Sequence, residues 1–275
     1  MNNPVIHRFI SNLEIEKNFL NVKKIRFYDK VTFILRKYIA ISLNKRKIVY
    51  LGSDFYYDNR FIPAMLQIYP IEIEQLGKCI ELGKLENVLD IGANIGQYSR
   101  TFNHYSPRTK IYSFEPNKEI FPYLLKNSLG KNIVCLNFGI GMKNEIKKFY
   151  FSPEASAEGT LLKENMNQIY VRAGVKEIEI SVVKLDKNNL KKYKLPSKFD
   201  LVKIDVEGYE ADVLKSLKYI SFRYLQIEVS LKRKGSTLDD IKKIIKENWK
   251  KDVKILYSEK ASDEAPAKNV FIELI

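Results

Sequence analysis

The sequence predicts an α/β fold in which helices cover both faces of a largely parallel β-sheet. Three short apolar segments support this prediction: Leu85–Ile91, Lys110–Glu115 and Phe199–Val206. Each has the near-continuous apolar character of a strand buried on both faces, and helical patterns lie between them. Strands that alternate with helices in this way are typical of a doubly wound sheet, which binds ligands at the carboxyl ends of its strands.

The first strand, Leu85–Ile91, runs into an acid and two glycines, Asp90, Gly92 and Gly96, before a helix predicted at Tyr98–His104. Glycine permits a sharp turn and a close approach of a ligand to the backbone. Asp90, just ahead of the first glycine, would repel a pyrophosphate and attract a cation. S-Adenosylmethionine carries an ammonium and a sulfonium group, so the turn favours this methyl donor over NAD.

The second strand, Lys110–Glu115, ends in an acid roughly 20 residues beyond the glycine turn, and an amphipathic stretch follows at Glu119–Leu129. An acid at this place in a doubly wound fold accepts hydrogen bonds from the two ribose hydroxyls of a nucleotide. We therefore expect Glu115 to bind the ribose of the cofactor.

The third segment places charges in a strand that should be buried. Lys203, Asp205 and Glu207 alternate with apolar residues and would share one face. Such a stripe is costly unless it is paired or functional. It could be a pair of Lys203 with an acid that only fixes the architecture, or it could belong to an active site.

A helix predicted at Glu210–Leu217 and a strand at Tyr224–Val229 would bring Glu228 beside Asp205. The acids Asp205, Glu207 and Glu228 then allow two interpretations. One is a general base for a hydroxyl substrate, and the other, which spacing alone cannot assign, is a divalent-metal site with oxygen ligands.

Three motifs, at Val88–Gly96, Phe114–Asn117 and Leu201–Glu210, resemble those of the FkbM family of class I methyltransferases. The resemblance extends over roughly Glu72–Glu228. It implies a Rossmann-like class I methyltransferase fold with a seven-stranded mixed sheet, S-adenosyl-L-methionine as cofactor and methyl transfer to oxygen. Catalysis would then fall to Asp205 or Glu207 as base, with Lys203 beside them. The expected cofactor-binding residues are Asp90, Gly92, Ala93, Asn94, Gly96, Glu115, Pro116, Asn117, Gly139 and Ile140.

Many methyltransferases carry an acid near the adenine after the third strand, which we expect at Ile133–Asn137. This chain instead has Phe138-Gly-Ile-Gly-Met142 there. We therefore expect Gly139 and Ile140 to hold the adenine through backbone and apolar contacts.

Two domains are expected, an N-terminal cap over residues 1–70 and a methyltransferase domain over residues 71–275. The cap should be helical at Ser11–Lys47 and form strands or a hairpin at Ile48–Tyr69. Its aromatic residues suit either a lid over the substrate or packing against the sheet; they are Phe55, Tyr56, Tyr57, Phe61 and Tyr69.

Two further regions complete the expected catalytic domain. The polar, turn-rich segment Phe149–Val175 could gate the acceptor site or be a surface excursion. At the C-terminus, a helix at Thr237–Trp249 and two strands at Val253–Tyr257 and Asn269–Leu274 would finish the sheet with a hairpin.

The net charge is +14, and lysines are scattered along the chain rather than gathered in one element. This distribution argues against a nucleic-acid groove and suits solvated lysine faces. The apolar segment Val31–Lys47, which ends in a basic cluster, could instead touch an anionic membrane, although Arg36 and Lys37 interrupt it too early for a membrane span.

A secretory leader is not recognisable, so we expect a cytoplasmic protein with a possible peripheral membrane contact. Cys79 and Cys135 should be reduced and buried, and His7 and His104 should lie at the surface.

The leading functional interpretation is an O-methyltransferase that acts on a hydroxyl of a sugar, glycan or related secondary metabolite. A nucleic-acid methyltransferase is the enzymatic alternative, but the chain lacks both the Asn/Asp-Pro-Pro-aromatic element and a Pro-Cys nucleophile. The non-enzymatic alternative is a protein that binds the cofactor without turnover. The sequence leaves the acceptor and the oligomeric state open.

Overall fold

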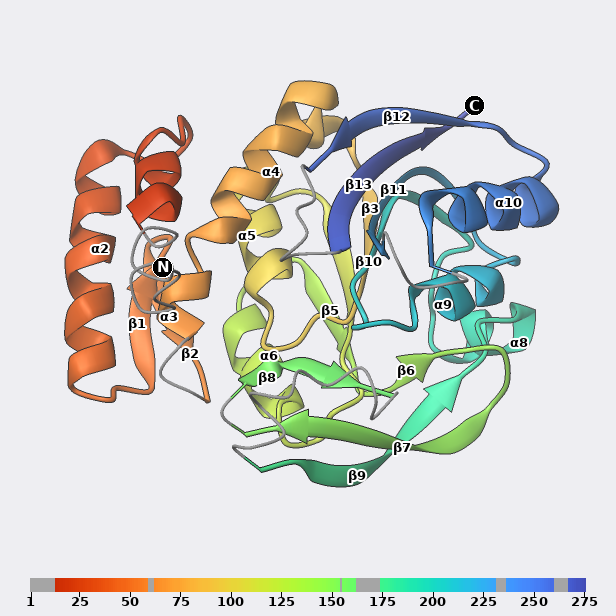
Figure 1. Cartoon of the computed structure of the whole chain (residues 1–275), viewed down its shortest axis with the longest axis horizontal. Coiled ribbons are helices and arrows are strands. Elements are labelled where there is room, and N and C mark those ends of the chain that lie inside the picture. The colour runs from red at the N-terminus through yellow and green to blue at the C-terminus, as the bar shows by residue number, and fades with distance from the viewer. Residues whose placement is uncertain (1–12, 59–61, 154, 162–173, 231–235, 260–266) are drawn as a thin grey trace, which may run out of the picture.

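A computed structural model describes residues 13–58, 62–153, 155–161, 174–230, 236–259 and 267–275 (Figure 1). Its main sheet has seven strands in the order β12-β13-β11-β10-β3-β4-β5, and only β13 and its pairings are antiparallel. This mixed sheet confirms the expected fold. The strands are β3 Asn87–Ile91, β4 Lys110–Phe114, β5 Ile133–Leu136, β10 Lys198–Ile204, β11 Ser221–Ser230, β12 Val253–Ser258 and β13 Ala267–Leu274.

Helices cover both faces of this sheet. On one face lie α4 (Ile68–Cys79) and α5 (Gln97–Tyr105), and on the other lie α8 (Lys187–Lys192), α9 (Glu210–Ser216) and α10 (Leu238–Trp249), while α6 (Phe121–Ser128) follows β4. Neighbouring residues of one strand enter different cores, because successive side chains point to opposite faces. Val88 packs with α4 and α5, for example, and Leu89 packs with α9 and α10.

The N-terminal part contains a helical stretch at residues 13–20, helix α2 (Phe27–Ser42) and the hairpin of β1 (Lys47–Tyr50) and β2 (Ser53–Tyr56). The hairpin is confirmed, and its two-residue turn has positive φ at Leu51 and Gly52. The single helix expected up to Lys47 is wrong, since irregular backbone separates the two helical stretches.

The prediction of strands as far as Tyr69 is also wrong. Residues after 61 form α3 (Ile62–Met65) and the start of α4. Each of these helices carries a proline in its first turn, Pro63 and Pro70, where the missing N–H has no helical partner to lose. The predicted boundary between residues 70 and 71 lies inside α4.

The N-terminal part shares a hydrophobic core with the main sheet. Phe19, Phe33, Tyr50 and Phe55 belong to the same cluster of buried side chains as Leu201. A polar contact strengthens this attachment.

The guanidinium group of Arg100, on α5, donates to the carbonyl oxygens of Asp54 at 2.6 Å, Ser53 at 2.8 Å and Tyr50 at 3.0 Å. The β1–β2 hairpin is therefore bound to the helix that follows the glycine turn.

A second sheet, of four strands, stands beside the main one in the order β6-β9-β7-β8. It consists of β6 Gly139–Ile140, β7 Glu145–Ser152, β8 Ala155–Thr160 and β9 Lys176–Val183. We had expected an irregular polar segment from residue 149, but residues 149–152 and 155–160 are strands, because Phe149 and Phe151 pack against β9 in a small core of their own. Residues 162–173 of that segment lie outside the described residues.

In the described part of the chain, no helix is long and apolar enough to cross a membrane. Cys79 and Cys135 are free thiols, as expected, but both are only partly buried. His104 is exposed, as expected, and His7 lies outside the described residues.

Candidate active site

The turn between β3 and α5 is fixed by its contacts with the neighbouring strand ends. Gly92 has a φ of 84°, and a Cβ atom there would lie 1.8 Å from the carbonyl oxygen of Asp205. The backbone N–H groups of Gly92 and Ala93 both donate to the carbonyl oxygen of Phe114, at 3.1 and 2.9 Å. Only glycine fits at position 92, because the ends of β10 and β4 close around it.

Glu115 follows β4 and is buried beside this turn. Its two carboxylate oxygens accept the backbone N–H groups of Asn117 at 2.7 Å and Asn94 at 2.9 Å. Burial raises the pKa of Glu115 to about 7, although these two bonds act in the opposite direction. A carboxylate offers about four lone-pair sites, so two remain for ligand hydroxyls. This donor set fits the ribose of an adenosine cofactor.

A cavity opens in front of Glu115. Its first wall comes from the ends of the main strands and includes the predicted residues Gly92, Asn94 and Pro116. Its second wall comes from the four-stranded sheet and the residue after β8; it includes the predicted residues Gly139 and Ile140 of β6, together with Phe149, Gly159, Leu161, Ile180 and Val182. The apolar second wall suits a flat adenine ring, as expected for a chain without an acid after its third strand. The predicted residue Asn117 does not line this cavity and acts through its N–H group on Glu115.

A smaller cavity continues from the first one and shares Gly92, Asn94 and Asp205 with it. It also contacts Tyr69, Ala93, Gln97, Tyr98 and Lys203. A ligand that extends along the glycine turn would therefore have Glu115 at one end and Asp205 and Lys203 at the other. The predicted Gly96 lies at the start of α5 with a φ of 91° and lines neither cavity.

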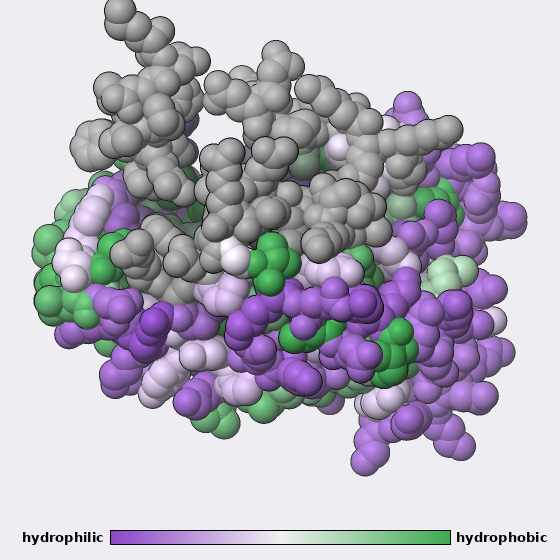
Figure 2. Space-filling view, turned by 60° about the horizontal axis from the view of Figure 1, so that its bottom comes forward, coloured by the Kyte–Doolittle hydropathy of each residue, from purple (hydrophilic) through white to green (hydrophobic). Residues whose placement is uncertain are grey.

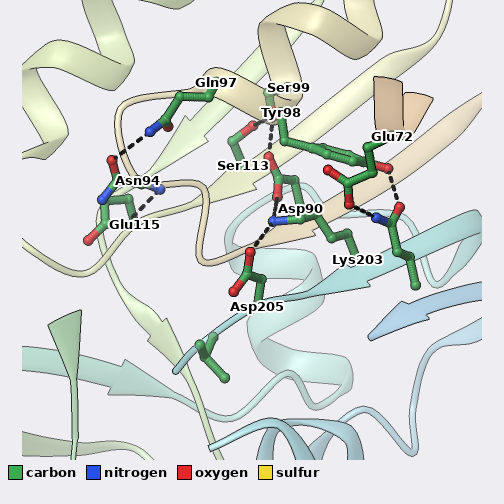
Figure 3. Close-up of polar contacts among 12 residues, drawn as sticks. Glu72, Asp90, Asn94, Gln97, Tyr98, Ser99, Ser113, Glu115, Lys203 and Asp205 are labelled. Atoms are coloured by element: carbon green, nitrogen blue, oxygen red, sulfur yellow. Dashed lines mark hydrogen bonds and ion pairs between the residues drawn. The ribbon is translucent and has the colours of Figure 1, made fainter. Parts of the chain in front are cut away.

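Lys203 is the centre of a buried polar network (Figure 3). Its ammonium group lies 3.0 Å from Asp205 Oδ2 and 3.8 Å from Asp90 Oδ1, and it stands 4.9 Å from the centre of the Tyr98 ring. Burial lowers the pKa of Lys203, but the carboxylates of Asp205, Asp90 and Glu72 outweigh this effect and raise it overall. Lys203 therefore remains charged and holds the acids around it.

Asp90 does not line either cavity. One of its oxygens accepts a hydrogen bond from Ser99 at 2.5 Å, and the other faces Lys203. Burial is the main cause that raises its pKa. Lys203, which lies beside Asp90, lines the smaller cavity, and a direct contact of Asp90 with the cofactor stays a prediction.

That Gln226 and Glu72 belong to this network was not predicted from the sequence. Gln226, on β11, donates to Glu72 Oε1 on α4, and the hydroxyl of Tyr98 lies 2.8 Å from Gln226 Oε1. Gln226 is in register with Lys203 and Asp90 across the sheet. As a polar residue inside an apolar strand, Gln226 could have been recognised. The sequence around Glu72 gives no such signal.

The three expected charges do not share one face. β10 ends at Ile204, and Glu207 adopts a φ of 50° in the following turn, where it lines the cavity of Glu115. Lys203 and Asp205 form an ion pair at 3.0 Å, and Asp205 and Glu207 line the same cavity. Among the described residues, no three His, Cys, Asp or Glu side chains are arranged to hold a metal ion. Asp205, Glu207 and Glu228 thus do not form the metal cluster considered above.

The mixed seven-stranded sheet and the glycine turn facing a buried acid define a class I methyltransferase fold. Residues 90–251 match the family model described as the methyltransferase FkbM domain. The chain belongs to this family, and S-adenosyl-L-methionine is its cofactor.

Known proteins similar to this chain are also methyltransferases. Hexuronic acid methyltransferase AglP of Haloferax volcanii is 26% identical over 218 residues, which cover 74% of this chain and 84% of AglP. Methyltransferase sdnD of Sordaria araneosa is 26% identical over 168 residues, which cover 50% of this chain and 64% of sdnD. The match thus spans just under two thirds of sdnD.

Similar solved structures include magnesium protoporphyrin IX methyltransferase (ChlM) of Synechocystis with bound SAM. It is 12% identical with a TM-score of 0.45, and the match covers 87% of this chain and 95% of ChlM. Another is TYW2 of Methanococcus jannaschii in complex with AdoMet, at 15% identity and a TM-score of 0.44, covering 83% and 84%.

Proposed function

We propose that the protein is an O-methyltransferase that acts on a hydroxyl group of a sugar, glycan or related secondary metabolite. The observation that carries this proposal is the position of Asp205. Asp205 lines both cavities along the glycine turn, and Lys203 holds its carboxylate at 3.0 Å. The similarity to a hexuronic acid methyltransferase supports a sugar as acceptor.

Each part of the site has a separate task in this proposal. Glu115 binds the ribose hydroxyls, and Pro116, Gly139 and Ile140 enclose the adenine. When bound, the cofactor supplies an electrophilic methyl group. A hydroxyl that accepts a methyl group must lose its proton, and an aligned base contributes roughly 10²–10⁴-fold to such a reaction. We assign this role to Asp205, with Glu207 as the alternative.

Replacing Asp205 by Asn tests the assignment. We expect kcat to fall at least 100-fold while calorimetric titration shows nearly unchanged cofactor affinity. Asp212→Asn is the matched control, because Asp212 is an exposed acid that pairs with Lys215 at 3.2 Å. A fully active Asp205→Asn enzyme would exclude Asp205, and an inactive Glu207→Gln enzyme would then assign the base to Glu207. Cofactor binding by the wild type without methylation of any hydroxyl acceptor would favour a binding protein instead.

We also propose that the outer face of α2 contacts an anionic membrane surface. Figure 2 shows hydrophobic side chains at the end of the molecule that α2 forms. The exposed apolar residues of this face are Phe27, Tyr28, Leu35, Ile39 and Leu43, each more than half exposed. A chain with a net charge of +14 repels a second copy of itself and is attracted to anionic lipid.

Co-sedimentation with vesicles of phosphatidylcholine and phosphatidylserine tests this second proposal. We expect binding that requires phosphatidylserine and is lost in the Leu35→Glu/Ile39→Glu variant. Equal sedimentation of variant and wild type would refute the contact, and a dimer that the variant dissociates would assign the face to a second copy.

A further inference from the structure

A cavity in the N-terminal part of the molecule is separate from the cofactor site. It has a volume of about 260 Å³ and lies between the start of α2, the β1–β2 hairpin and the end of α5 (Figure 1). His104, near the end of α5, lines it, whereas the glycine turn lies before Gln97 at the other end of that helix. Seven helical residues, or ~10 Å, separate the two ends, so a ligand in this cavity would be neither the cofactor nor the methyl acceptor.

The cations of the lining outnumber its acids. Lys24, Arg26 and Arg36 line the cavity, and in the described lining Asp29 is the one acid. Arg26 pairs with Asp29 at 2.7 Å, while neither Lys24 nor Arg36 forms an ion pair with any described residue. Two positive charges in this lining are therefore left for a ligand to balance.

The charged ends of side chains from several elements act on His104. Partial burial lowers the pKa of its imidazole, and nearby cations lower it further. These cations are Lys131, Arg100 and Lys24, while Asp29 acts in the opposite direction. A pKa that cations from different elements lower indicates a positive potential where His104 lines the cavity.

Helix α2 adds to this attraction for an anion. Arg26 precedes its first turn, and the Arg26 side chain does not cap the N–H groups there. Unpaired N–H groups and the helix dipole favour negative charge at a helix N-terminus. The bonds of Arg26 to Asp29 use its Nε and one terminal nitrogen, so the other terminal nitrogen can still donate. Arg36 follows Asp29 by seven residues, which is about two turns, and so lies on the same side of α2.

We propose that this cavity binds a phosphate monoester. This group carries about −1.5 to −2 charges at pH 7 and three strong acceptor oxygens, so it matches the two excess cations and their N–H donors. A carboxylate would supply only one charge. The headgroup of an anionic lipid and a soluble sugar or glycerol phosphate both offer this chemistry. A lipid headgroup would bind next to the exposed apolar face of α2, because Arg26 and Arg36 are the sequence neighbours of Phe27 and Leu35.

His104 provides a direct spectroscopic probe of this site. The chain has two histidines, and His104→Asn identifies the imidazole signal of His104 in NMR spectra of the full chain. Glycerol 3-phosphate, added at constant ionic strength, should shift this signal saturably and raise the pKa of His104, because a bound dianion stabilises the imidazolium. Sodium chloride at the same ionic strength should do neither.

A pair of substitutions tests the cations. Lys24→Gln/Arg36→Gln should weaken binding of glycerol 3-phosphate at least tenfold, while cofactor affinity stays unchanged because both side chains are exposed. Lys187→Gln/Lys191→Gln is the matched control, since it removes two exposed lysines from α8 on the other face of the main sheet. An equal loss in the two variants would show a general effect of net charge and would overturn the proposal.

Vesicles distinguish a lipid headgroup from a soluble phosphate compound. Phosphatidate carries a phosphate monoester, whereas phosphatidylserine carries a diester. A headgroup site predicts at least tenfold tighter binding to phosphatidate vesicles than to phosphatidylserine vesicles of equal charge, with competition by glycerol 3-phosphate. Binding of glycerol 3-phosphate without this preference would assign the cavity to a soluble phosphate compound.

No saturable change at His104, or a change that Lys24→Gln/Arg36→Gln leaves intact, would also overturn the proposal. It is independent of methyl transfer, and its failure is distinguishable from failure of the membrane contact proposed above. Leu35→Glu/Ile39→Glu should lose vesicle binding but still bind glycerol 3-phosphate, because its substitutions lie outside the lining of the cavity.

Discussion

Replacing Lys203 by Met should destabilise the protein severely, because it removes the cation that lies beside the buried Asp90 and the partly exposed Asp205. Met keeps most of the side-chain volume, so the change isolates the charge. The Lys203 side chain is 5% exposed and that of Asp90 is 0% exposed, at a distance of 3.8 Å. Within the part of the chain that the structure describes, Asp90 Oδ1 has no hydrogen-bond partner.

Two unit charges at that distance attract by about 4 kcal/mol at an effective dielectric constant of about 20. Asp205 adds less than its shorter distance suggests, because its side chain is 37% exposed and solvent screens it. Breaking a buried pair by removing one partner costs about 3–5 kcal/mol. For a chain of this size, we expect a loss of roughly 6–20 °C in Tm.

The loss should depend on pH in a defined direction. Burial already raises the pKa of Asp90, and loss of Lys203 would raise it further. A group whose folded pKa is raised stabilises the protein below its unfolded pKa, about 4, and this stability is lost as pH rises through the folded value. The deficit of the variant should therefore grow from pH 5 to pH 8.

Urea denaturation of wild type and variant across this pH range measures the effect. The double variant Asp90→Asn/Lys203→Met should recover part of the loss, since the uncompensated acid is gone. Lys215→Met, which removes an exposed partner of Asp212, should cost less than about 0.5 kcal/mol. A deficit below about 1 kcal/mol for Lys203→Met, or one that shrinks as pH rises, would refute the reasoning.

Two further predictions concern the cofactor turn. Cofactor affinity should fall about tenfold between pH 8 and pH 6, because burial raises the pKa of Glu115 to about 7 and the ribose binds the ionised carboxylate. Calorimetric titration at several pH values measures this change, and Glu115→Ala should abolish binding. An affinity that does not change with pH would contradict the ribose-binding role of Glu115. Gly92→Ala should prevent cofactor binding or folding, since the new Cβ atom would lie 1.8 Å from the carbonyl oxygen of Asp205. Gly52 has a similar positive φ but open space around it, so Gly52→Ala should lower the free energy of unfolding by only about 1–2 kcal/mol, as measured by thermal denaturation. Equal losses of stability in the two alanine variants would show that backbone strain at positive φ, and not the contact with Asp205, causes the effect of Gly92→Ala.

The central strands and the glycine turn could be predicted because their signals are local. A buried parallel strand is largely apolar, as at Val88–Ile91, where Asp90 is the one charged residue. The sharp turn that follows requires a glycine at position 92. Glu115 was predicted as the ribose ligand for the same reason, since its place at a strand end follows from the chain alone. The structure places it in the lining of the cavity between the two sheets.

The roles of Asp90 and Glu72 and the second sheet could not be predicted, because they depend on contacts between segments that are distant in the sequence. Asp90 looked like a ligand because its charge was considered alone, whereas Lys203 from another strand lies beside it. Glu72 gains its place only when α4 packs over β11, 154 residues away along the chain. β7 was not predicted, because its apolar side chains Phe149 and Phe151 gain a core only when β7 packs against β9.

The bonds from Arg100 to the β1–β2 hairpin have a consequence for protein engineering. Arg100 lies on the helix that begins at the glycine turn, and its guanidinium group donates hydrogen bonds to the carbonyl oxygens of Tyr50, Ser53 and Asp54. Exchanging the N-terminal segment for that of a relative would therefore disturb this helix as well. Chimeras made to change acceptor preference should therefore keep the hairpin and Arg100 together as one inherited unit.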